Sequence, residues 1–116
     1  MSAAPELPDE VLSAFRDRLT RDADRLGALR DALAAEEAPV LSEDPRRDEI
    51  EQLAHGLVGT GATFGFAEVG AAAEDVERLA GLSRLSAAAD PECRRLLLLA
   101  VERLQHALGA EHAPGE

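Results

Sequence analysis

The sequence is short of aromatic residues, cysteine and positive charge, and each shortage excludes a class of protein. Its 116 residues include three Phe but no Trp or Tyr. A core must therefore be built mainly from Leu, Val and Ala, as it is in helical bundles. The single cysteine, Cys93, cannot form a disulfide within the chain. Hydrophobic residues still make up 46% of the sequence, which is enough for the core of one small domain.

The shortage of basic residues excludes several kinds of partner. Lys and Arg together number 12 against 23 Asp and Glu, so the net charge is −11. Contacts with nucleic-acid phosphates and with anionic lipids need basic side chains. We therefore expect binding to neither nucleic acid nor a membrane surface, and we ascribe the acidic balance to solubility. The first ten residues are acidic and contain proline, unlike a signal peptide, so a cytoplasmic location is expected.

Apolar residues recur at helical spacing in four segments, and no strand pattern is evident. The predicted helices cover residues of about 8–35, 45–64, 66–80 and 91–108. Their short connections favour antiparallel neighbours. The sequence thus predicts a single all-α domain, an up-down antiparallel four-helix bundle over residues 8–109, with flexible tails at 1–7 and 110–116.

Local signals support the ends of these helices. Asp44 before Pro45, and Asp90 before Pro91, pair a helix-capping side chain with a proline suited to the first helical position. Gly109 follows the last apolar residue of the fourth segment, where a glycine is expected to end the helix.

The second helix carries a histidine outside its apolar face. The apolar face is formed by Ile50, Leu53, Ala54, Leu57, Gly61 and Phe64. At about 100° per residue, His55 lies roughly 140° away from Ile50, so we expect its side chain to point outward. Neither His106 nor His112 has such a setting, and the three histidines and Cys93 show no metal-ligand spacing.

Glycines are unusually dense around this histidine. Gly56, Gly59 and Gly61 each weaken the helix by about 1 kcal/mol relative to alanine, so close approach of another surface is the natural reason for them. The spacing of these glycines does not complete either of two phosphate-binding motifs. A P-loop would need lysine where Ala62 stands, and a dinucleotide fingerprint would need glycine where Phe64 stands.

The string AHGLVGTGATFG, followed by a helix ending in VERL, resembles the histidine-containing phosphotransfer (HPt) domain. His55, Leu57, Gly59 and Gly65 match that family's pattern, and the order and length of the helices resemble it over about 8–108. The resemblance implies an exposed mid-helix histidine on a four-helix bundle. It also implies that His55 accepts a phosphoryl group within a two-component phosphorelay, as a phosphocarrier intermediate rather than an enzyme.

The resemblance also implies roles for other residues. Glu77, on the third helix, would hydrogen-bond the δ nitrogen of His55 and leave the ε nitrogen as the phosphorylation site. Gly59 would leave room for a partner to approach. The expected docking surface for a receiver comprises Gln52, Gly56, Val58, Gly59 and Ala62. Alternatively, Glu77 is an ordinary solvated helix residue that pairs only with its neighbours.

The implied partners are a response-regulator receiver domain, a hybrid histidine kinase, or both. The receiver's aspartate and its Mg²⁺ would supply the electrostatic part of phosphoryl transfer. We expect no cofactor, metal or ATP on this chain, and we expect a monomer.

The chain departs from the family where Val58 occupies the usual position of a lysine that offsets the charge of phosphohistidine. No arginine or lysine lies within a turn on the same face of the helix. The phosphorylated form would then be short-lived, or the protein would be a phosphorylation-incompetent adaptor that docks without carrying phosphate. The remaining hypothesis is that the chain is an acidic helical bundle unrelated to the family.

Overall fold

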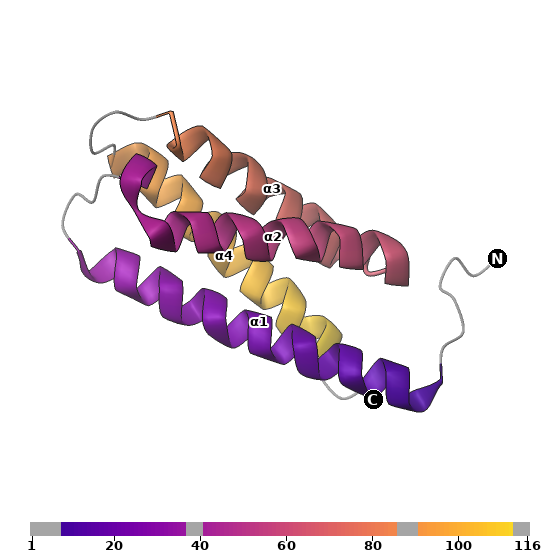
Figure 1. Cartoon of the computed structure of the whole chain (residues 1–116). Coiled ribbons are helices and arrows are strands. Elements are labelled where there is room, and N and C mark those ends of the chain that lie inside the picture. Colours follow the sequence, from indigo (N-terminus) through magenta and orange to yellow (C-terminus); the bar gives the residue numbers. More distant parts are fainter. Residues whose placement is uncertain (1–7, 37–40, 86–90, 113–116) are drawn as a thin grey trace.

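The computed structural model describes residues 8–36, 41–85 and 91–112, and within these ranges all regular structure is helical. In chain order the elements are α1 (Asp9–Ala35), the short 3-10 helix η1 (Leu41–Glu43), α2 (Pro45–Phe64), α3 (Ala67–Ser83) and α4 (Pro91–His112). Successive α-helices run in opposite directions (Figure 1). The prediction of an all-α, up-down antiparallel four-helix bundle is confirmed.

Each α-helix packs chiefly against two others around one core. Helix α2 packs along α3, α3 along α4, and α1 along α4 and less extensively along α2. Fully buried leucines of α1, α2 and α4 meet in the centre, and α3 contributes smaller buried residues there. The leucines are Leu19, Leu26, Leu33, Leu57, Leu97 and Leu104, and the residues of α3 are Val69, Ala73 and Val76. Burial of each large aliphatic side chain contributes about 1.5–3 kcal/mol, so this core accounts for the fold without aromatic residues at its centre.

Helix α2 begins at a well-made cap. The Asp44 carboxylate accepts a hydrogen bond from the backbone N–H of Arg46 at 2.9 Å, and Pro45 occupies the first helical position. The Arg46 guanidinium also binds this carboxylate, at 2.9 Å through Nε. These contacts lower the pKa of Asp44, the side-chain hydrogen bond from Arg46 being the main cause. The start of the histidine-bearing helix is therefore held by a charged cap.

A buried arginine ties the same end of α2 to its neighbours. The side chain of Arg47 is 2% exposed. Its guanidinium donates to the carbonyl of Leu41 in η1 at 2.9 Å and to that of Ala80 in α3 at 3.1 Å. It also pairs with Glu51 at 3.0 Å and with Asp48. A buried charge is tolerated only with such complete pairing, so Arg47 fastens three elements together.

The connection from α2 to α3 is a tight turn through Gly65, whose φ of 78° suits glycine. The backbone N–H of Phe66 donates to the carbonyl of Gly61 at 2.9 Å. The ring of Phe15 in α1 covers this turn, with its centroid 4.1 Å from that of Phe64 and 5.5 Å from that of Phe66. The three phenylalanines of the chain thus gather at one end of the bundle.

Just before this turn, α2 and α3 approach closely at a pair of glycines. A Cβ atom added to Gly61 would lie 2.8 Å from the backbone Cα and N of Gly70. Only a residue without a side chain fits there. This contact sets the spacing of the two helices, and it explains why Gly61, one of the three glycines near His55, is a glycine.

Two helices extend beyond their predicted ends. Helix α3 continues through Gly81 to Ser83, and α4 continues through Gly109 to His112. One interior glycine costs only about 1 kcal/mol, which neighbouring contacts can offset. Ser83, for example, is buried and donates from its hydroxyl to the carbonyl of Leu79 at 2.8 Å. The prediction that Gly109 ends the last helix was wrong.

Other sequence predictions fall on residues that the structure does not describe. They are the tail at 1–7, the last part of the tail at 110–116, and the capping role of Asp90.

The glycine contact can be tested with a matched pair of substitutions in α2. Gly61→Ala should lower the free energy of unfolding by about 2 kcal/mol, because its methyl group would meet the backbone of Gly70. Gly59→Ala should leave stability unchanged or raise it by up to about 1 kcal/mol, since no atom lies within 4 Å of the added carbon. Urea unfolding followed by circular dichroism measures both, and equal effects would contradict the close approach.

The charged cap has a defined pH dependence. Asp44→Ala should cost about 1 kcal/mol of unfolding free energy at pH 7. Because folding lowers the pKa of Asp44 below its ordinary value of 3.8, its contribution is complete above that value and disappears as the pH falls through the folded pKa.

The difference between wild type and Asp44→Ala should therefore shrink in acid, as urea titrations at several pH values would reveal. Asp24→Ala, at an exposed position of α1, is the control and should change little. A loss at Asp44 that stays constant into acid would argue against the ionised cap.

Candidate functional site

His55 lies in the middle of α2 with its side chain 77% exposed. Its neighbours Ala54 and Leu57 are fully buried, so the backbone beneath the imidazole is held by the core while the ring faces solvent. The sequence predicts that the side chain of His55 points away from the apolar face of α2, and its exposure in the structure agrees with this prediction.

The register of α2 against α3 brings a carboxylate to the imidazole. From the contact between Gly61 and Gly70, His55 lies six residues back along α2, or about 9 Å. Glu77 lies seven residues forward along α3, or about 10.5 Å. The two helices are antiparallel, so these positions meet at nearly the same level. The Nδ1 atom of His55 is 2.6 Å from Oε2 of Glu77.

This hydrogen bond decides which ring nitrogen can react. A carboxylate can only accept, so in the neutral imidazole Nδ1 carries the hydrogen that Glu77 binds. The lone pair is then on Nε2, the nitrogen that points away from Glu77. An exposed imidazole oriented by a carboxylate is suited to nucleophilic attack through Nε2.

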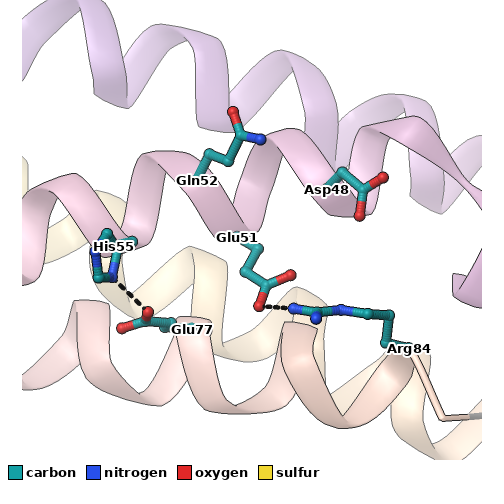
Figure 2. A pocket seen from close by; sticks show the side chains of 6 residues that line it. All are labelled: Asp48, Glu51, Gln52, His55, Glu77 and Arg84. Carbon is teal, nitrogen blue, oxygen red and sulfur yellow. Dashed lines mark hydrogen bonds and ion pairs between the residues drawn. The ribbon is translucent and has the colours of Figure 1, made fainter.

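The imidazole borders a shallow hollow of about 450 Å³ (Figure 2). Its lining residues are Asp48, Glu51, Gln52, His55, Glu77 and Arg84. The only basic side chain among them, Arg84, forms an ion pair with Glu51. Carboxylates outnumber guanidinium groups in its lining, but Asp48 and Glu51 are paired with Arg47 and Arg84, so Glu77 contributes most of the uncompensated negative charge.

The residues predicted to dock a partner lie on both sides of His55. Val58 and Ala62 line a second hollow, toward α3, together with Gly70. Gln52 lies on the side of α2 that faces α1, where it borders a third hollow with residues of α1 (Figure 2). Around Gly59 the surface is open, with no atom within 4 Å of the position of a Cβ.

Sequence reasoning missed one arginine near this site, because it considered only the helix that carries the histidine. Arg18 of α1 places its Nη2 atom 3.2 Å from where a Cβ of Gly56 would lie. Gly56 directly follows His55, so a guanidinium from another helix lies against the residue next to the histidine in the chain. Arg18 and Gly56 are 38 residues apart, and no local motif connects them.

Comparison with protein families agrees with this geometry. The family model described as the Hpt domain matches residues 10–107. The chain belongs to the Hpt domain family. Membership implies a histidine phosphotransfer role in phosphorelays, and Hpt domains are phosphocarriers that generally interact with response-regulator receivers and kinases. The searches of curated proteins and of solved structures returned no match.

Two features are absent from the part of this Hpt domain that the structure describes. In the described ranges, no helix combines the length and the apolar character that crossing a membrane requires. The same residues contain no cluster of three or more His, Cys, Asp or Glu side chains that could hold a metal ion.

The contact between Glu77 and His55 should control the tautomer of the imidazole. In Glu77→Ala, the ratio of the Nδ1–H to the Nε2–H tautomer of His55 should fall by roughly tenfold, because a charge-assisted hydrogen bond is lost. Long-range ¹H–¹⁵N spectra of the neutral histidine ring, recorded at alkaline pH, measure this ratio. Glu74→Ala, one turn earlier on the exposed side of α3, should leave it unchanged. An unaltered ratio in Glu77→Ala would show that this hydrogen bond does not orient the ring.

Proposed function

We propose that this Hpt domain accepts a phosphoryl group on Nε2 of His55 and passes it to or from the aspartate of a response-regulator receiver. The observation that carries the proposal is the 2.6 Å contact between Nδ1 of His55 and Glu77 on an otherwise exposed ring. It leaves one nitrogen with a lone pair directed at solvent, where a partner can reach it.

In the transfer onto this chain, the Nε2 lone pair attacks phosphorus of the partner's aspartyl phosphate. The Nε2–P bond forms as the P–O bond to the aspartate breaks, and the aspartate carboxylate leaves. The ring then carries phosphorus on Nε2 and hydrogen on Nδ1, so positive charge develops on the imidazole. The Glu77 carboxylate stabilises that charge, and the reverse transfer follows the same path.

The surface around His55 supports docking of a folded partner. The approach to the ring is unobstructed at Gly59, and Gln52 and Ala62 are exposed on either side. Together with Gly56 and Val58 they form the docking surface that we propose for the receiver. The Mg²⁺ needed for phosphoryl transfer would belong to the receiver. We further propose that the chain acts as a cytoplasmic monomer, with no ATP binding or turnover of its own.

A second candidate function rests on the charge of the site. Val58 stands where the family usually has lysine, and the hollow beside His55 is lined by three carboxylates. A site that repels phosphate would suit an adaptor that docks on a receiver or kinase without being phosphorylated.

Transfer of ³²P from a phosphorylated receiver distinguishes the two functions. The wild-type chain should acquire an acid-labile, base-stable label, and His55→Gln should acquire none. His106→Gln, an exposed histidine of α4, is the matched control and should be labelled like wild type. Receiver binding is measured in parallel for all three proteins. Absence of label from the wild type, with binding intact, would reject the carrier in favour of the adaptor.

A further inference from the structure

Phosphorylation of His55 would create a local excess of negative charge. A phosphoryl group brings between about −1.5 and −2 charges at pH 7. It would stand beside the carboxylate of Glu77 and the acidic hollow, on a chain of net charge −11. Phosphate sites in proteins are normally completed by cationic donors. The bundle therefore needs a cation near Nε2 if the phosphorylated form is to persist.

Few cations are available close to His55. All twelve basic residues of the chain are arginines, and none lies on α2 beyond Arg47. Arg84 borders the same hollow, but its guanidinium is paired with Glu51. Arg47 is buried and fully occupied by its own partners. Arg78, which follows Glu77 on α3, is paired with Asp75 at 3.3 Å. Arg18 of α1 is a further neighbour, and its ion pair, at 3.6 Å, is the longer of the two.

Arg18 has the position and the exposure that a cation needs in order to bind a phosphoryl group on His55. Its Nη2 atom lies over Gly56, the residue after His55, at 3.2 Å from the position of a Cβ. Its side chain is 50% exposed. Gln52 borders both the hollow that contains His55 and the hollow that contains Arg18, so the two hollows are adjacent. Because positions 56 and 59 are glycine, neither places a side chain between the guanidinium and the histidine face, and Gln52 is the residue of α2 that borders both hollows.

The acidic groups around Arg18 hold it weakly. Its guanidinium forms an ion pair with Asp22, in which Nε and Oδ2 are 3.6 Å apart. Burial raises the pKa of Asp22 in spite of the adjacent guanidinium, which marks the pair as a weak one. The other carboxylate of this hollow, Glu49, is bound by Arg25 at 2.5 and 2.7 Å. The guanidinium can therefore exchange Asp22 for a phosphoryl group.

We propose that Arg18 of α1 binds the phosphoryl group on Nε2 of His55, replacing from a neighbouring helix the cation that α2 lacks at Val58. This inference rests on the proposed function. The guanidinium presents a planar fork of N–H donors that matches phosphate oxygens. Gly56 has a specific purpose in this arrangement, because a side chain there would occupy the path of the arginine.

The test is a ³¹P NMR titration of the chain phosphorylated with potassium phosphoramidate, which needs no partner protein. The His55 resonance is assigned by its loss in His55→Gln. A nearby guanidinium favours the doubly charged phosphoryl group, so Arg18→Gln should raise the midpoint of its last protonation by about half a pH unit. Arg18→Lys should restore part of the shift, and Asp22→Asn should lower the midpoint because it removes the competing carboxylate.

Arg16→Gln, which removes the same charge from an exposed position two residues earlier, is the matched control and should move the midpoint much less. Equal midpoints in wild type and Arg18→Gln would overturn the role of Arg18 and leave the carrier function standing. A wild-type chain with no His55 phosphoryl resonance would overturn both. Circular dichroism of each variant establishes that the bundle is intact, as expected for a half-exposed side chain.

Discussion

The contact between Gly61 and Gly70 governs the rest of the site. Two helices can approach this closely only where neither carries a side chain, and here a single added carbon would lie 2.8 Å from the opposite backbone. The contact sets both the spacing and the register of α2 and α3. With the register set, Glu77 comes level with His55 and the two side chains meet at 2.6 Å. A slip of one residue would rotate Glu77 by about 100° and separate them.

Electrostatics shapes the surface around this contact. The hollow beside the imidazole contains Asp48, Glu51 and Glu77, and its one arginine is paired. The Glu77 carboxylate, which accepts from Nδ1, would stabilise the positive charge that the ring carries in the phosphorylated form that we propose. It disfavours the phosphoryl group itself. In the phosphorylated form that we propose, the balance between these effects would depend on a cation from outside α2, and the packing of α1 brings Arg18 close to Gly56.

Much of the fold follows from local patterns along the chain. Apolar residues at helical spacing, the capping pair Asp44–Pro45 and the turn glycine Gly65 locate the helices, because each acts through neighbours a few residues away. Helix ends were less well predicted. Gly81 and Gly109 look like terminators, but both lie inside helices, since a single interior glycine costs a helix only about 1 kcal/mol.

The sequence by itself determined the four helices, the outward direction of His55 and the family pattern around it, because periodicity and motif spacing are local properties. That Glu77 orients the imidazole was expected only through the resemblance, and the contact depends on the register between two helices. The position of Arg18 beside Gly56 was decided by the tertiary structure alone. It depends on how α1 packs across α2, and packing joins residues whose separation of 38 positions leaves no periodic or motif signal in the chain.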